Sequence, residues 1–249
     1  MGLGWGRWDR ISIDETTPSR GPGGPPGQTV DTKIVQQLVR EIEAKDASTA
    51  AHTWRVVLYL RAMLEERGVR GDELLLATHG AALHDVGKID IPAEILQKPG
   101  ALTPEEFEVI EQHTVTGYAR MIALDVEEDT ILDIVRYHHE KMDGTGYPYR
   151  MTESEIPQIA RDFAVIDTFD ALTSHRPYRH EVGHDAGDKA IGMLIEAKGP
   201  KYHSDSVELF ADLYHRGKLD YILNYFNDGA ELPGYGSVDD DELTKSIRV

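Results

Sequence analysis

The sequence contains no cysteine among its 249 residues. Disulfide bonds, thiolate metal sites, iron–sulfur clusters and cysteine nucleophiles are therefore excluded, and any metal ion must be held by histidine and carboxylate side chains. The chain also has no apolar run near the roughly 18 residues that a membrane span requires, and residues 1–20 contain no apolar signal segment. These absences predict a cytoplasmic protein that does not interact with a membrane.

Positive charge is scarce as well. The chain has 26 Lys and Arg residues against 44 Asp and Glu residues, which gives a formal net charge of −18. Sequence-independent binding to DNA or RNA depends on cationic side chains that neutralise phosphates, so this balance argues against a nucleic-acid duplex as a partner. An anionic substrate would have to be met by bound divalent ions together with a few placed Arg and Lys side chains.

Glycine and proline are concentrated at the N-terminal end. Residues 1–30 are predicted to form an extension or linker without a core of its own, although Trp5 and Trp8 would allow this segment to dock on the domain or on a partner. Residues 31–230 are long enough for one substantial core and are predicted to form a single domain. Residues 231–249 are polar and acidic and are expected to be a solvated tail.

Apolar residues recur at helical spacing through this domain, while no segment shows a strand pattern, so the sequence predicts an all-α fold. A helix is expected to begin with Thr103 as its cap and Pro104 in its first turn, and to carry His113 in its second half. Residues 186–226 are predicted to form two or three amphipathic helices that close the bundle. Their inner faces are expected to carry Ile191, Leu194, Ile195, Val207, Phe210, Leu213, Tyr221 and Leu223.

Histidine and aspartate recur in an order that can build a two-metal hydrolytic centre. Imidazole and carboxylate suit iron, manganese, nickel or zinc, and one Asp can bridge two ions through its two oxygens. His84 and Asp85 are adjacent at the end of a predicted helix, and Lys88 follows about one turn later, where its ammonium could contact a phosphate or protonate a leaving oxygen. Taken alone, this pair is equally explained by a capped helix with a surface histidine.

A second motif removes that alternative. It reads His138-His139-Glu140-Lys-Met-Asp143-Gly-Thr-Gly146-Tyr147-Pro148. With this motif the chain resembles the HD-GYP family of the HD metal-dependent phosphohydrolase superfamily. The likeness extends from the segment around His52, through Ala81–Pro92, to the segment from Asp167 to Arg179. Several long motifs in one order are far more specific than a lone short pattern.

The resemblance implies an HD-type helical bundle with additional C-terminal helices, in which residues 31–230 form an HD-GYP catalytic domain. It implies hydrolysis of cyclic di-GMP to linear pGpG and on to GMP, by attack of a metal-bridging hydroxide at a binuclear centre. One ion would take His52, His84, Asp85 and Asp167, and the other would take Asp85, His113, His138 and His139. A histidine-rich pair of sites without thiolates favours iron or manganese, while nickel and zinc share these ligands.

Some family members bind a third ion through a Glu four residues before the first His. Ser48 occupies that position here, so two ions are expected. Arg176, Tyr178 and Arg179 match the family's substrate-facing Arg-Pro-Tyr-Arg segment, although in so acidic a chain the arginines could instead pair with Glu or Asp. Asp170 could orient a ligand or water as part of the catalytic machinery, or could be a plain buried hydrogen-bonding Asp.

Gly146, Tyr147 and Pro148 are explained by a tight turn after the ligand-bearing helix. The resemblance implies that this turn also borders the active site and contacts partners such as diguanylate cyclase domains or adaptor proteins. Two rival functions remain open at this stage: hydrolysis of another cyclic dinucleotide such as 3′,3′-cGAMP, and a non-catalytic nucleotide-binding or interaction module. The sequence also leaves a homodimer open, together with the identity of the metal and of the final product.

Overall fold

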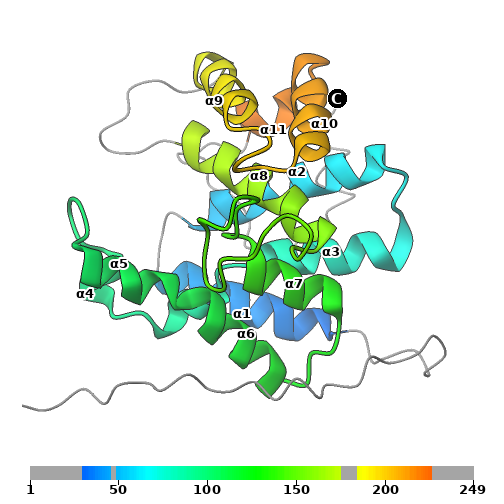
Figure 1. The fold of residues 1–249 in the computed structure, drawn as a ribbon. Helices are drawn as coiled ribbons and strands as arrows, with labels where there is room; N and C mark the ends of the chain where they lie inside the picture. Colours follow the sequence, from blue (N-terminus) through cyan, green and yellow to red (C-terminus); the bar gives the residue numbers. More distant parts are fainter. Residues whose placement is uncertain (1–29, 46–48, 175–183, 226–249) are drawn as a thin grey trace, which may run out of the picture.

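The computed structural model describes residues 30–45, 49–174 and 184–225, and these residues form an all-α fold (Figure 1). The predicted fold class is therefore confirmed. The helices are α1 (Thr32–Lys45), α2 (Thr49–Glu66), α3 (Gly71–Leu83), η1 (Val86–Asp90), α4 (Ala93–Leu96), α5 (Pro104–Glu111), α6 (His113–Ala123), α7 (Asp129–Tyr137), α8 (Gln158–Thr173), α9 (His184–Glu196), α10 (Ser204–His215) and α11 (Asp220–Tyr225).

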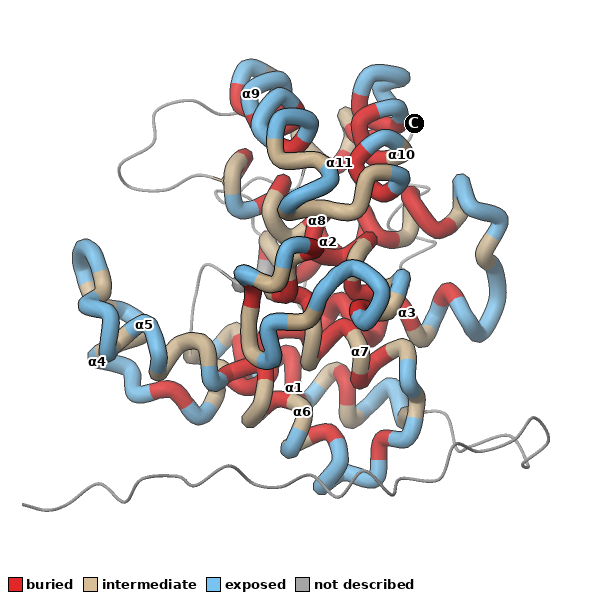
Figure 2. The backbone as a smooth tube through the Cα atoms, viewed as in Figure 1, coloured by how far each residue is buried: buried red, intermediate tan, exposed pale blue. Residues whose placement is uncertain are grey.

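The bundle is built around α2, which packs against both α3 and α8, while α7 packs against α3 and α8 in turn. Its core holds large aromatic side chains that are fully buried, namely Trp54, Tyr59, Phe163, Phe169 and Phe210. Figure 2 shows buried residues concentrated in these central helices, whereas α4 and α5 project from the bundle and bury none of their residues. None of the described helices is long and apolar enough to cross a membrane.

Three helices, α9, α10 and α11, follow α8 and pack onto α8 and α2 at one end of the bundle (Figure 1). This agrees with the two or three helices predicted for this stretch. The assignment of Ile195 to an inner face was wrong, because its side chain is 47% exposed while Leu194 is 1% exposed. Consecutive residues point about 100° apart on a helix, so Ile195 can turn towards solvent although its neighbour Leu194 faces the bundle.

The helix predicted to carry His113 in its second half is two helices. Thr103 does form a capping box with Glu106 and Pro104 stands in the first turn, as predicted, but α5 ends at Glu111 and His113 begins α6. Gln112 keeps near-helical backbone dihedrals at φ −64° and ψ −16°. Because neither glycine nor proline marks the break, the sequence pattern could not show it.

Close backbone packing of η1 against α6 places the loop that follows His84. A Cβ atom at Gly87 would overlap the carbonyl oxygen of His113 and would lie 2.6 Å from the amide nitrogen of Gly117. We therefore expect Gly87→Ala to lower the free energy of unfolding by about 3 kcal/mol, as measured by urea denaturation.

The matched control for this prediction is Gly192→Ala in α9. A Cβ there meets nothing within 4 Å, so the same substitution should raise the free energy of unfolding by up to about 1 kcal/mol through helix propensity alone. Equal stabilities of the two variants would contradict the close approach of η1 and α6.

The predicted extension of residues 1–30 lies outside the described residues except for Val30, which packs against the core. The predicted tail of residues 231–249 also lies outside them, as does Ser48.

Candidate metal centre

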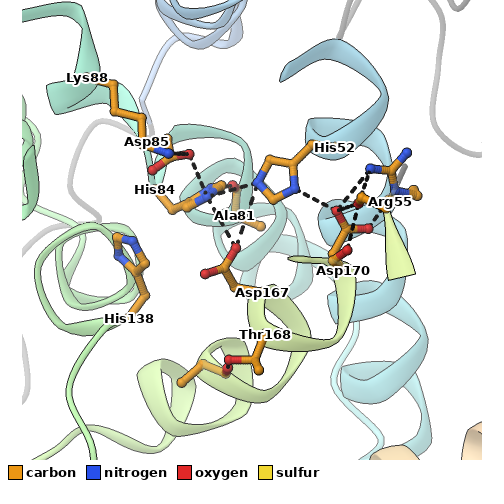
Figure 3. Close-up of polar contacts among 12 residues, drawn as sticks. His52, Arg55, Ala81, His84, Asp85, Lys88, His138, Asp167, Thr168 and Asp170 are labelled. Carbon is orange, nitrogen blue, oxygen red and sulfur yellow. Dashed lines mark hydrogen bonds and ion pairs between the residues drawn. The ribbon is translucent and has the colours of Figure 1, made fainter. Parts of the chain in front are cut away.

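The predicted metal ligands come from five places in the fold and converge on one region, part of which is drawn in Figure 3. The histidines and aspartates fall into two groups of potential metal donors, whose ligand atoms lie within 4.8 Å of one another inside each group. One group comprises His52 on α2 with His84 and Asp85 between α3 and η1; the other comprises His113 on α6 with His138 and His139 after α7.

In the first group, the Nε2 atoms of His52 and His84 face each other at 3.2 Å. Asp167 Oδ1 on α8 lies 3.8 Å from His52 Nε2 and 3.9 Å from His84 Nε2. Two nitrogen donors that share a tetrahedral ion at about 2.0–2.1 Å lie about 3.3 Å apart. The separation of the two imidazoles therefore fits donors to a common ion.

The second group has the same arrangement. His113 Nε2 lies 3.3 Å from His138 Nε2. The ring of His139 lies 4.1 Å from the ring of His138 and 5.1 Å from that of His113, measured between centroids. Three imidazoles at this spacing again fit one divalent ion.

Asp85 stands between the two groups. Its Oδ2 lies 3.2 Å from His84 Nε2, and its Oδ1 lies 3.5 Å from His113 Nε2. Burial raises the pKa of Asp85, but the charges of His84 and Lys88 lower it more, so its net pKa lies well below the ordinary value. The carboxylate is ionised at neutral pH and turns one oxygen towards each group, as a bridging ligand would.

Backbone carbonyls fix the tautomers of three of these histidines. Nδ1 of His84 donates to the Ala81 carbonyl at 2.7 Å, Nδ1 of His113 donates to the Ile110 carbonyl at 2.7 Å, and Nδ1 of His138 donates to the Ile134 carbonyl at 2.9 Å. Since a carbonyl can only accept, the proton resides on Nδ1. The Nε2 lone pair is then free to bind a cation.

Burial favours the uncharged form of the three histidines in the second group. It lowers the pKa of His113 to about 4, and burial together with neighbouring imidazoles holds the pKa values of His138 and His139 well below the ordinary value. His84 differs: burial lowers its pKa, but the adjacent Asp85 carboxylate raises it more, and the net pKa is raised. The Asp85 carboxylate thus favours a proton on His84, and a divalent ion at the first group would compete with that proton.

His52 is oriented by a carboxylate instead of a carbonyl. Its Nδ1 donates to Asp170 Oδ2 at 2.8 Å, and Asp170 also receives Arg55 Nε at 2.5 Å and Arg55 Nη2 at 3.0 Å (Figure 3). Asp170 was expected either to orient a metal ligand or to be a plain buried hydrogen-bonding residue. The structure places it in contact with the predicted ligand His52. Sequence reasoning missed Arg55, although its position one helical turn after His52 on α2 was the available signal.

Lys88 points towards the same region, where its ammonium donates to Asp85 Oδ2 at 2.6 Å and its side chain is 27% exposed. Tyr147 of the Gly146-Tyr147-Pro148 turn stacks beside His139, with ring centroids 4.7 Å apart. Burial, and then the negative charges of Asp85 and Asp167, raise the pKa of Tyr147, so its phenol remains neutral. The predicted substrate contacts Arg176, Tyr178 and Arg179 lie outside the described residues.

Sequence comparisons point in one direction. A family model described as HD domain matches residues 36–205. A cyclic di-GMP phosphodiesterase of Thermotoga maritima is 38% identical over 197 residues, covering 75% of this chain and 52% of that protein. A 3′3′-cGAMP-specific phosphodiesterase 2 of Vibrio cholerae is 34% identical over 184 residues, covering 72% of this chain and 34% of that protein. The chain thus spans about half the length of the first relative and less of the second.

Structural comparison agrees on the fold. Bd1817, a HDG"Y"P protein from Bdellovibrio bacteriovorus, has a TM-score of 0.53 at 21% sequence identity, covering 74% of this chain and 60% of that chain. At this identity the likeness concerns the helical fold alone.

Proposed function

The chain belongs to the HD domain family, in its HD-GYP branch, and we propose that it is a metal-dependent phosphodiesterase that hydrolyses cyclic di-GMP. One observation supports this proposal most strongly: Asp85 turns one carboxylate oxygen towards each of two histidine groups. A carboxylate in that position would be able to hold two divalent ions, which would supply the chemistry of phosphodiester hydrolysis. Residues 31–230 would form the catalytic domain.

The donor set fits two divalent ions. His52, His84, Asp85 and Asp167 would hold one ion, and Asp85, His113, His138 and His139 would hold the other. Iron or manganese suits this thiolate-free set, and nickel or zinc could bind the same donors. Such ions, when bound, supply an activated water and neutralise the negative charge that develops on the phosphoryl oxygens.

The chain's own residues would position the substrate and the metal ligands and would neutralise negative charge on the phosphate. Lys88 donates to Asp85 and keeps part of its side chain open to solvent, so its ammonium lies beside the metal groups, where it is proposed to contact a phosphate oxygen or protonate a leaving oxygen. Asp170, fixed by Arg55, holds the ring of His52 in one tautomer. Arg176, Tyr178 and Arg179 are proposed to contact the substrate. The Gly146-Tyr147-Pro148 turn is proposed as a surface for diguanylate cyclase or adaptor proteins.

We propose linear pGpG as the first product, with further hydrolysis to GMP. A second candidate substrate is 3′,3′-cGAMP, which the similarity to a 3′3′-cGAMP-specific relative favours. Metal ions at these histidine groups would act on the phosphodiester bonds, which both substrates share, so the groups carry no preference between the two.

The test is hydrolysis of each cyclic dinucleotide by the purified chain after anaerobic reconstitution with Fe(II) or Mn(II). Products are separated by chromatography and metal is counted in the same sample, with His84→Ala as the control. We expect wild-type protein to release pGpG from cyclic di-GMP, and the control to lose turnover together with the ion that His84 would hold. Full metal occupancy without turnover of either substrate would overturn the enzymatic proposal in favour of a nucleotide-binding module.

A further inference from the structure

His139 differs from the other four predicted histidine ligands in how its ring is held. Each of the others uses Nδ1 to donate to a backbone carbonyl or to the Asp170 carboxylate. Among the described residues, His139 has no such hydrogen bond from either ring nitrogen. Metal-binding imidazoles are usually oriented by a partner on the second nitrogen, so another contact must fix this ring.

That contact is the ring of Tyr147. Its centroid lies 4.7 Å from that of His139, and the two ring planes are inclined by only 33°. Tyr147 also packs edge-on against His113 at 6.3 Å and against Phe107 at 6.2 Å. The tyrosine therefore lies against two of the three histidines in the second group, and a tilted ring contact at this distance restricts rotation of the His139 imidazole.

The backbone brings Tyr147 back to His139 through a tight return. The Tyr147 amide donates to the His139 carbonyl at 3.3 Å. A Cβ at Gly146 would lie 2.5 Å from both the Glu140 Cα and the His139 carbonyl oxygen, so the turn can approach this closely only with glycine at that position.

Glu140 fixes the far side of the same turn. Its side chain is only 1% exposed, and its two carboxylate oxygens accept the amides of Tyr149 at 2.7 Å and of Met151 at 3.0 Å. A buried carboxylate that accepts two backbone N–H groups holds that backbone strongly, because charge-assisted hydrogen bonds are about twice as strong as neutral ones. The residue that follows His139 thus anchors the segment that returns to stack on it.

We infer that Tyr147 is the positioning residue of His139, and that Glu140 holds Tyr147 in place. This inference rests on the proposed two-ion centre, and it gives the Gly146-Tyr147-Pro148 turn a role within the chain. The aromatic face is what acts on His139, so the phenol oxygen is dispensable for this role whereas the ring is not.

The experiment measures Mn(II) binding by equilibrium dialysis of purified wild-type protein, Tyr147→Leu, Tyr147→Phe and Glu140→Gln. Tyr147→Leu keeps an apolar side chain but removes the stack, and we expect it to weaken one of two bound ions about tenfold or more while the other keeps its affinity. Tyr147→Phe restores the ring and should bind both ions as wild-type protein does. Glu140→Gln loses one amide acceptor and should weaken the same single ion.

Thermal unfolding of the metal-free variants separates positioning from a fold defect, since only one ion should weaken while the unfolding temperature stays close to wild type. Two ions bound with unchanged affinity by Tyr147→Leu would overturn the inference and leave the proposed function standing. Equal loss of affinity in Tyr147→Phe and Tyr147→Leu would also overturn it, because the phenol oxygen would then be the active group. Wild-type protein that binds no Mn(II) would overturn the proposed function and this inference together.

Discussion

Replacing Asp85 with Ala is expected to remove both metal ions and to lower the rate of cyclic di-GMP hydrolysis by about a thousandfold or more. That factor corresponds to about 4 kcal/mol of lost transition-state stabilisation. The reason is the position of the carboxylate, whose Oδ2 lies 3.2 Å from His84 Nε2 and whose Oδ1 lies 3.5 Å from His113 Nε2. The measurement is metal content and turnover of the same purified sample.

Two further variants test whether the loss of both ions is specific to Asp85. His113→Ala removes a donor from one group only, so it should preferentially weaken one ion. Asp90→Asn removes an exposed carboxylate five positions from Asp85 that pairs with Arg120, and it should leave metal content unchanged. If the Asp85 variant kept two ions with wild-type affinity, the assignment of Asp85 as the bridging ligand would be refuted.

Replacing Asp170 with Ala is expected to lower the free energy of unfolding by about 3–5 kcal/mol. The substitution leaves the guanidinium of Arg55 buried without its carboxylate, since Arg55 is 5% exposed and makes two hydrogen bonds to Asp170. It also removes the acceptor of His52 Nδ1. Urea denaturation of the metal-free proteins measures the loss directly.

A double variant distinguishes the loss of the carboxylate charge beside Arg55 from the loss of side-chain volume. Arg55→Met combined with Asp170→Leu replaces the pair by apolar side chains, and it should be more stable than Asp170→Ala alone. A double variant as unstable as Asp170→Ala would show that the cost does not come from separating the Arg55 charge from the Asp170 carboxylate.

The same pair predicts a pH dependence. Burial raises the pKa of Asp170, but the Arg55 charge and the hydrogen bond from His52 lower it more, and the net pKa lies well below the ordinary value. A group with a depressed pKa in the folded state stabilises the fold above its unfolded pKa of about 3.9 and loses that contribution as the pH falls. The stability difference between wild type and Asp170→Ala should therefore be constant near neutral pH and shrink below about pH 4.

Helix positions followed from local patterns. The capped start at Thr103 and the helix ending before His84 were predictable because capping chemistry and apolar spacing act within a few residues. The break at Gln112 was not, since its dihedrals remain near helical and neither glycine nor proline marks it.

The sequence by itself determined the chemistry available to this protein: no thiolate, a surplus of negative charge, and histidines and aspartates whose order matches the HD-GYP motifs. Only the tertiary structure decided how these groups meet. Asp85 between two histidine groups, Arg55 beneath Asp170, and Tyr147 against His139 each depend on how separate segments come together in space. Residue type and short-range spacing are encoded locally, whereas the approach of distant side chains depends on core packing, which no local pattern specifies.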